Sequence, residues 1–404
     1  MTDVRPVNWK KNLAVVWLSQ FLAMAGFGCC MPFIPLLLKD NLQILDDQVR
    51  GVYVSAYYFV GMASLTVAYV IWGALADRFG RKIMILRASY TAAIFYPLLA
   101  FAPNVWILLL VRFVSAFFSG TVNPAQTLLV TTAPPEKHGY VLGILSTALG
   151  GGHLVGYMGG GLIVEAYGYT AAFVTCGVVY FIGGLLVHLF AEEHFERPVR
   201  TAKKKKPPFR EIASPGVVWL MALFFLLGIA QRISQPFVAE QVMFIMREGR
   251  IAFFTSVASA AAAVGGILAG FLVGKLSDRI PPGRLLIPVL ALSAVTRLMQ
   301  AYASHIWMFV VAGFLMSLLT SMIQPLLQVM LTRITLIERR GAYFGWSASL
   351  SSGGGIACSF ISGAIAYFAD VRGIFAASAV LLLLMVPMML PTNRACRKEE
   401  IPQP

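Results

Sequence analysis

Charged residues are scarce in this chain of 404 residues. Asp, Glu, Lys and Arg make up 12% of it and hydrophobic residues 58%, whereas a soluble domain has roughly 25% charged residues. A soluble protein of this composition would have to bury nearly all of itself, which the surface-to-volume ratio of folded chains excludes. The composition therefore indicates an integral membrane protein, because lipid solvates apolar side chains.

Cysteine is also scarce, with five residues. Cys29, Cys30, Cys176 and Cys358 lie in apolar runs and Cys396 lies in the C-terminal tail, so no metal-ligand spacing or disulfide framework emerges. We interpret them as small hydrophobic residues and expect neither a metal site nor a cofactor. The first apolar run is too long for the core of a cleaved signal peptide. The sequence also lacks a phosphate-binding loop, which argues against ATP-driven pumping.

The few charged residues leave long uncharged runs between them. A bilayer-spanning helix needs about 20 such residues, and helix is expected because unpaired backbone groups in hydrocarbon cost several kcal/mol each. The runs predict an all-α integral membrane protein with twelve transmembrane helices, at about 12–38, 50–75, 83–102, 106–130, 139–163, 168–190, 216–238, 252–275, 285–303, 306–331, 341–366 and 372–390.

Positive charge is distributed unevenly among the predicted loops. If both termini are cytoplasmic, 24 of the 32 Lys and Arg residues lie in cytoplasmic segments and only five, including Arg50, lie in outer loops. The positive-inside rule favours this orientation. The net charge of +14 follows from the same asymmetry, so it does not indicate nucleic-acid binding.

The two halves of the sequence resemble each other at a nearly constant offset. Residues 73–78, GALADR, match residues 274–279, GKLSDR, and Pro124 matches Pro325, both at an offset of 201. A charged, proline-rich stretch at 191–215 separates the halves and is predicted to be a linker. The repeat predicts two six-helix bundles, 1–190 and 216–404, around a central cleft. Such bundles can rock and open the cleft to either side in turn.

The segment from Gly73 to Lys82, GALADRFGRK, resembles the signature between helices 2 and 3 of the major facilitator superfamily. The resemblance covers nearly the whole chain. Within the family, the opening VNWKKN and the MPFIP that ends helix 1 are similar to the MdtG-type multidrug efflux proteins of the bacterial drug:proton antiporter branch. The resemblance implies the two-bundle fold and secondary transport.

The same resemblance implies that the signature locks one conformation of the carrier. Its residues are Gly73, Asp77, Arg78, Gly80, Arg81 and Lys82, with Asp278 and Arg279 in the second half. We expect Gly73 to let helix 2 approach a neighbouring backbone, and Asp77 to lie near the positive end of a helix dipole. The alternative is a basic loop that only sets the topology.

Two other motifs match the family except at one expected residue each. Arg112 resembles the buried arginine of helix 4, linked by analogy to proton movement, although Ala116 replaces the expected glycine. Helix 5 resembles the antiporter motif that marks export, although Tyr157 replaces the expected proline. The glycines of that motif, which we expect to allow close helix packing, are Gly152, Gly156, Gly159 and Gly160.

Ionisable side chains within membrane spans are candidates for function, because charge is costly there. Arg112 begins a polar stripe on one face of the predicted helix 106–130, through Ser119, Asn123 and Gln126. His153 lies near mid-depth, and an unperturbed imidazole titrates near pH ~6.5. The candidates for proton coupling are Arg112, His153, Glu165 near the outer end of helix 5, and Glu240 just outside helix 7. For the arginine and the histidine, hydrogen-bonded packing is the alternative.

Polar, aromatic and methionine side chains of the cleft helices are candidates for substrate binding. Methionine and aromatic residues adapt to varied apolar ligands, although similar stripes occur in ordinary packing. The candidates are Gln20, Met24, Phe27, Asn123, Gln126, Gln231, Arg232, Gln235, Gln324, Gln328 and Trp346. Because no carboxylate lies at mid-depth, a cavity with Arg112 and Arg232 favours neutral or anionic amphiphiles. We interpret Arg297, on a scaffold helix, as structural.

The sequence thus predicts a secondary transporter rather than an enzyme. We expect a monomer in the bacterial inner membrane that exports small amphiphilic molecules in exchange for protons. An uptake carrier or facilitator for an organic anion or small metabolite would use the same fold. A membrane enzyme would need a nucleophile–base pair or a metal cluster, and the sequence shows neither. A non-transporting sensor would bind without flux.

Overall fold

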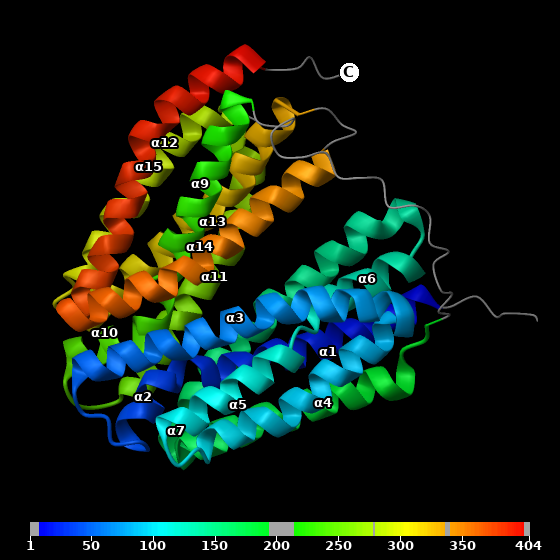
Figure 1. Ribbon diagram of the computed structural model, residues 1–404, viewed down its shortest axis with the longest axis vertical. Helices are drawn as coiled ribbons and strands as arrows, with labels where there is room; N and C mark the ends of the chain where they lie inside the picture. Colours follow the sequence, from blue (N-terminus) through cyan, green and yellow to red (C-terminus); the bar gives the residue numbers. More distant parts are fainter. Residues whose placement is uncertain (1–7, 194–213, 278, 336–339, 400–404) are drawn as a thin grey trace, which may run out of the picture. The chain divides into compact units, whose positions relative to one another are not determined.

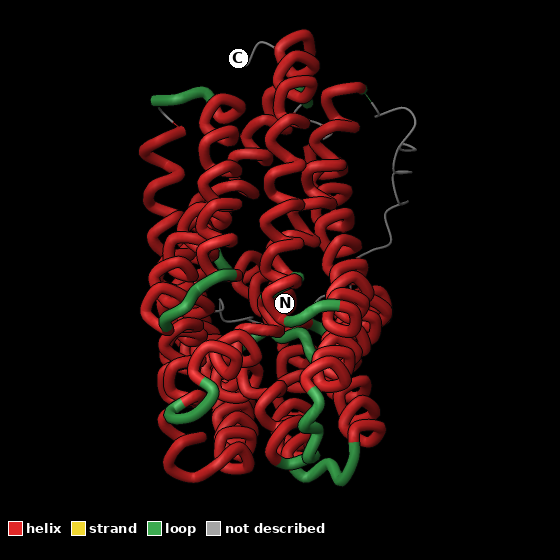
Figure 2. Tube along the Cα trace, turned by 90° about the vertical axis from the view of Figure 1, so that its left-hand side faces the viewer, coloured by secondary structure: helices red, strands yellow, loops and turns green. Residues whose placement is uncertain are grey.

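A computed structural model of the chain describes residues 8–193, 214–277, 279–335 and 340–399. All regular structure in these ranges is helical, as Figure 2 shows. Within them, eleven helical segments are long and apolar enough to cross a membrane. The all-α membrane class is therefore confirmed, whereas the number of twelve helices stays a prediction.

Within each half of the sequence, the helices follow one another along the chain (Figure 1). The first half of the sequence forms α1 (Trp9–Cys30), α2 (Ile34–Asp40), α3 (Asp47–Phe79), α4 (Arg81–Ala100), α5 (Val105–Phe118), α6 (Val122–Thr132) and α7 (His138–Phe190). The second half forms α9 (Pro215–Arg232), α10 (Val238–Met246), α11 (Ile251–Ser277), α12 (Pro282–Ala301), α13 (Ile306–Arg333), α14 (Arg340–Phe368) and α15 (Val371–Glu399).

Helix α7 covers two of the predicted spans. It has 53 residues and a kink at Gly168, where φ is 81°. This left-handed backbone conformation favours glycine, which explains why the chain bends at this residue. The kink coincides with the predicted start of the span at 168–190.

The predicted span at 106–130 matches the candidate membrane span Val105–Thr132, but it is not one continuous helix. The structure has two helices there, α5 and α6, separated by residues 119–121. Gly120 has φ 101°, which ends the helical geometry. The stripe from Arg112 to Gln126 therefore does not lie on one continuous helix.

The predicted end of helix 7 at residue 238 is also wrong. After α9, a short 3-10 turn at Gln235–Phe237 contains Pro236, which cannot continue the hydrogen-bond ladder of a helix. The chain then resumes as α10, and one candidate span covers Pro215–Met246. Glu240, expected just outside the helix, lies within this span.

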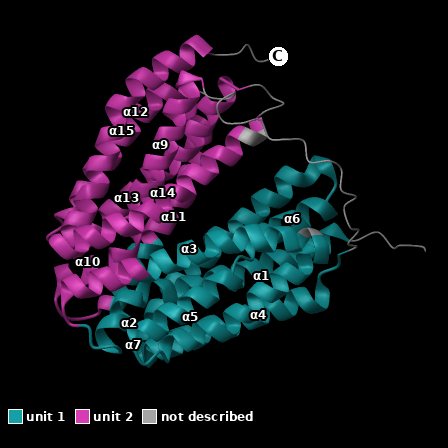
Figure 3. Cartoon of the chain, in the orientation of Figure 1, with its two compact units in different colours: residues 1–44, 57–201, 252–260 teal, residues 45–56, 202–251, 261–404 magenta. Residues whose placement is uncertain are grey.

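The described chain clusters into two compact units, coloured separately in Figure 3. Unit 1 comprises residues 1–44, 57–201 and 252–260, and unit 2 comprises 45–56, 202–251 and 261–404. Two helices are therefore shared: α3 begins in unit 2 and continues in unit 1, and α11 begins in unit 1 and continues in unit 2.

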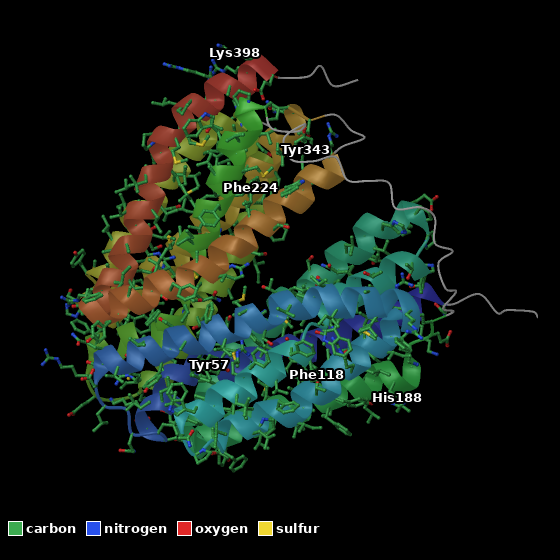
Figure 4. All side chains as sticks on the ribbon, viewed as in Figure 1. Tyr57, Phe118, His188, Phe224, Tyr343 and Lys398 are labelled. Carbon is green, nitrogen blue, oxygen red and sulfur yellow. The ribbon has the colours of Figure 1, made fainter. Side chains whose placement is uncertain are left out.

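Each unit has its own apolar core. In unit 1 the buried side chains include Val16, Ile85, Leu128 and Leu145. In unit 2 a larger cluster surrounds Phe224 of α9, which Figure 4 labels. All five cysteines are free and buried, which confirms their interpretation as small hydrophobic residues.

Candidate functional site

Glycines of α7 let this helix pack directly against the backbone of α1. An added Cβ at Gly152, Gly156 or Gly160 would lie less than 3.0 Å from a carbonyl oxygen of α1. An added Cβ at Gly159 would meet no atom within 4 Å. The close packing predicted for the antiporter motif is therefore confirmed at three of its four glycines.

The second half repeats this packing between α9 and α14. An added Cβ at Gly354 would crowd the carbonyl oxygen of Phe225, and one at Gly228 would crowd that of Ser351. Gly152 and Gly354 are separated by the offset of 202 residues in the sequence. The repeat thus recurs at the level of helix contacts.

The signature loop between α3 and α4 is held by a carboxylate from beyond α7. Gly80, with φ 93°, separates the two helices. Glu193 accepts hydrogen bonds from the backbone N–H groups of Arg81 (2.8 Å) and Lys82 (2.7 Å), which otherwise lack partners at a helix start. Lys82 Nζ donates to the carbonyl of Ala191 at 2.7 Å. No motif or spacing in the sequence pointed to this role of Glu193.

Other parts of the signature are open or lie outside the described atoms. An added Cβ at Gly73 would meet no described atom within 4 Å, and the expected close approach of helix 2 to a neighbouring backbone stays a prediction. The side chain of Asp77 and all of Asp278 fall outside the described atoms. Arg78 and Arg279 are exposed. The locking role of the signature stays a prediction.

Arg112 of α5 projects into a group of aromatic side chains. Its guanidinium carbon lies 4.8 Å from the ring centroid of Tyr57 on α3, which Figure 4 labels. An added Cβ at Gly61 would lie less than 3.0 Å from the guanidinium, so this glycine makes room for it. Arg112 forms no ion pair with any residue that the structure describes, and its Nε is buried without a hydrogen-bond partner. Aromatic faces stabilise such a cation.

Glu240 of α10 forms a buried ion pair with Arg50 of α3. Its two carboxylate oxygens accept from Arg50 Nε at 2.7 Å and Nη2 at 2.8 Å, which is a bidentate geometry. The side chains are only 7% and 2% exposed. Asp47 also pairs with Arg50, but Asp47 is 82% exposed.

The sequence assigned Arg50 to an outer loop, and this placement is wrong. Arg50 lies in the first turn of α3 and is one of the largest fully buried side chains described. Its partner Glu240 lies 190 residues away in the sequence. Only the run Asp46-Asp47 before Arg50 hinted locally at a charge to be neutralised.

Comparison with known proteins decides the family. The family model "Major Facilitator Superfamily" matches residues 16–249 and 244–404, which is nearly the whole chain. The chain belongs to the Major Facilitator Superfamily. It is 30% identical over 384 residues to "Multidrug resistance protein MdtG" of Salmonella heidelberg (strain SL476), covering 94% of both chains. MdtG of Salmonella arizonae shows the same identity and coverage.

Solved structures of other transporters share the fold. A bacterial homologue of the human lysosomal transporter Spinster superimposes with a TM-score of 0.77 at 16% identity, covering 98% of this chain and 99% of that chain. The nucleoside transporter NupG gives 0.75 at 12% identity, covering 95% and 99%. Membership of the Major Facilitator Superfamily, and not the likeness of fold, makes the chain a multi-pass secondary transporter rather than an enzyme.

The remaining proton-coupling candidates of this transporter, His153 and Glu165, differ in their surroundings. His153 Nδ1 lies 2.8 Å from the carbonyl oxygen of Leu149, so Nδ1 carries the hydrogen. Its ring packs edge-on against Phe27, with 5.9 Å between centroids. Glu165 is exposed and accepts from the backbone N–H of Phe253 at 3.1 Å, in the first turn of α11.

Two substrate candidates of the first half, Gln20 and Asn123, lie at or next to the break between α5 and α6. Gln20 is fully buried, and its Oε1 accepts from Thr121 Oγ1 at 3.0 Å between α5 and α6. Met24 lies against Gly152. Asn123 is exposed and lines a cavity of about 230 Å³ in unit 1, whereas Gln126 is half-buried outside it.

The candidates of the second half are more dispersed. Gln231 Nε2 donates to the carbonyl of Thr320 at 3.0 Å. Arg232 ends α9 as an exposed side chain beside Gly355. The others, Gln235, Gln324, Gln328 and Trp346, are exposed or half-buried. Arg297 is buried and donates from Nη1 to Gln300 Oε1 at 2.7 Å, which fits a structural role.

Proposed function

We propose that this transporter exports small amphiphilic molecules across the bacterial inner membrane in exchange for protons. Export is supported by the MdtG multidrug resistance proteins, which match over 94% of the chain, and by the tightly packed glycines of α7. Positive charge concentrated in one set of loops favours cytoplasmic termini. Both bundles belong to one chain, so we expect a monomer to suffice.

The observation that carries proton coupling is the buried ion pair between Glu240 and Arg50. A buried pair is stable while both charges are present, and loss of one partner leaves an uncompensated charge. Protonation of Glu240 removes its negative charge, so Arg50 loses its buried bidentate partner and retains the solvent-exposed Asp47. The attraction between the start of α3 and α10 then weakens.

Helix α3 gives this step a mechanical consequence. Its first turns belong to unit 2, where Arg50 meets Glu240, and its remaining turns belong to unit 1. Release of the first turns therefore frees a helix that is covalently part of both units. We propose that this release is the conformational step to which proton movement is coupled.

Neutral or anionic amphiphiles fit the charges of the candidate site better than organic cations do. Arg112 is a buried cation among aromatic rings, and it forms no ion pair within the described chain. Glu240 is already neutralised by Arg50. A cationic substrate would therefore meet repulsion at Arg112.

The test is flux in proteoliposomes under an imposed pH gradient, with neutral, anionic and cationic fluorescent amphiphiles. We expect wild-type protein to move neutral and anionic probes in the direction opposite to proton movement. Glu240→Gln should abolish proton-driven accumulation, whereas the matched control Glu165→Gln should retain it. Normal proton-driven accumulation by Glu240→Gln would refute the coupling assignment, and movement with the protons would show uptake instead of export.

A further inference from the structure

The break between α5 and α6 exposes backbone groups that a continuous helix would pair. Trp72 Nε1 of α3 donates to the carbonyl of Phe117 at 2.8 Å, and Arg87 Nη2 of α4 donates to that of Ser119 at 3.2 Å. Non-helical backbone at membrane depth is tolerated where it is buried in protein or lines a cavity. Both conditions occur here, because Ser119 and Gly120 lie in the wall of the cavity of about 230 Å³.

Arg87 reaches this cavity with unused hydrogen-bonding capacity. Its guanidinium carbon lies 3.7 Å from the ring centroid of Trp72. Its Nε and Nη1 are buried without a hydrogen-bond partner. Buried donors of a charged group normally have partners, because leaving them unpaired costs free energy. An acceptor supplied by a ligand would satisfy them.

The rest of the wall combines positive charge with apolar surface. Arg81 lines the cavity beside Arg87, and none of the described residues of the wall is acidic. Tyr69, Trp72 and Met84 supply aromatic and apolar surface. The wall therefore matches a molecule with an acidic head and an apolar body, because a guanidinium binds phosphate or carboxylate with charge-assisted hydrogen bonds.

We propose that this cavity binds an acidic amphiphile, with its phosphate or carboxylate head at Arg87 and its apolar part against Trp72 and Tyr69. The ligand is either a transported molecule or an anionic lipid of the bilayer, since both carry this chemistry. Its role as a substrate subsite rests on the proposed function, whereas binding itself does not.

Calorimetric titration of the full-length protein in phosphatidylcholine nanodiscs tests the site, with dodecyl phosphate as the probe. Loss of the Arg87 donors should weaken binding at least ~10-fold in Arg87→Gln, because charge-assisted hydrogen bonds are lost. Asn123→Phe, which fills the cavity and leaves Arg87 in place, should weaken binding similarly. The matched control is Arg372→Gln, because Arg372 stacks on Phe244 at 4.2 Å within unit 2 and is not one of the residues that line the cavity.

Specific outcomes would overturn the proposal. One is an unchanged affinity for dodecyl phosphate in both Arg87→Gln and Asn123→Phe. Another is a loss of affinity in Arg372→Gln as large as in the cavity variants. A third is binding of dodecylamine as tight as that of dodecyl phosphate. Inorganic phosphate that binds as tightly as dodecyl phosphate would contradict the apolar part of the site. Thermal melting of each variant identifies misfolded samples, and either cavity variant alone suffices for the test.

Two further arms separate the sources of the ligand. If phosphatidylglycerol in the nanodisc displaces dodecyl phosphate from wild-type protein, the occupant is a membrane lipid. The occupant is a substrate if dodecyl phosphate still binds in the presence of phosphatidylglycerol and proteoliposomes transport labelled dodecyl phosphate. The flux should then be at least ~10-fold slower in Arg87→Gln. Binding without any proton-driven flux would refute the proposed function and leave this site standing.

Discussion

The two shared helices, α3 and α11, begin in equivalent surroundings at an offset of 201 residues. Ser55 Oγ of α3 lies 3.1 Å from Ser362 Oγ of α14. At the equivalent positions, Ser256 of α11 lies directly against Gly161 of α7, where no Cβ could be added without displacing the serine. The two halves thus share the same pairing of helices, α3 with α14 and α11 with α7, but differ in the side chains at the contact.

The charges at the two helix starts differ more than the packing does. The start of α3 is held by a buried side-chain ion pair, Arg50 with Glu240. The start of α11 is held by the exposed Glu165, which accepts from a backbone N–H. A proton on Glu240 takes the carboxylate charge from a buried ion pair, whereas a proton on Glu165 acts on an exposed carboxylate that caps a helix start. Of the two equivalent helix starts, the start of α3 is therefore the one that we propose as the proton sensor.

The largest expected effect comes from Glu240→Gln. It leaves Arg50 buried without its bidentate partner, so we expect a loss of about 3–5 kcal/mol in the free energy of unfolding. Denaturation of purified protein in detergent measures it. The double variant Arg50→Met with Glu240→Gln should recover part of the loss, and no recovery would show that the pair is not the cause.

Gly161→Ala breaks the packing on the α11 side of the comparison. The added methyl group must displace Ser256, and we expect overpacking to cost about 1–3 kcal/mol in the same unfolding assay. Gly159→Ala is the matched control, because its added methyl group meets no atom within 4 Å. Equal losses in the two variants would mean that the α7–α11 contact does not limit stability.

Ser362→Ala tests the corresponding contact on the α3 side. Removing one hydroxyl leaves Ser55 without this partner, and we expect a cost of about 1 kcal/mol. Removing both hydroxyls, in Ser55→Ala with Ser362→Ala, should be closer to neutral than Ser362→Ala alone. A purely additive result in the double-mutant cycle would argue against a hydrogen bond between them.

Glu165→Gln should have the smallest effect. The charge at the start of α11 contributes about 0.3–1 kcal/mol when exposed, and the amide oxygen can still accept from the backbone of Phe253. Unfolding measurements at low and high salt should show this small loss and its screening. A loss as large as that of Glu240→Gln would erase the distinction between the two helix starts.

Much of the fold was predictable because uncharged runs and the repeat offset are properties of the sequence itself. The break at Gly120 was not, because residues 119–121 lie within a long uncharged run and only the backbone conformation reveals them. The end of helix 7 was predicted too early, because Arg232 and the polar residues after it lower the local hydropathy. The chain nevertheless resumes as a helix, α10.

The candidate site was only partly predictable, because its contacts join distant parts of the sequence. Glu240 and Arg112 were identified from the sequence as ionisable groups near the membrane, but no partner was predicted for either of them. Arg50 was assigned to a loop, since its burial depends on a carboxylate 190 residues away. Arg87 was counted as one of many cytoplasmic charges, since its unpaired donors become visible only beside Trp72.

Infrared difference spectroscopy during acidification tests the central claim most directly, because it reports when a buried carboxylate takes up a proton. We predict a protonated-carboxyl band in wild-type protein and in Glu165→Gln, and its absence in Glu240→Gln. The same band with undiminished intensity in Glu240→Gln would contradict proton exchange at the carboxylate that faces Arg50.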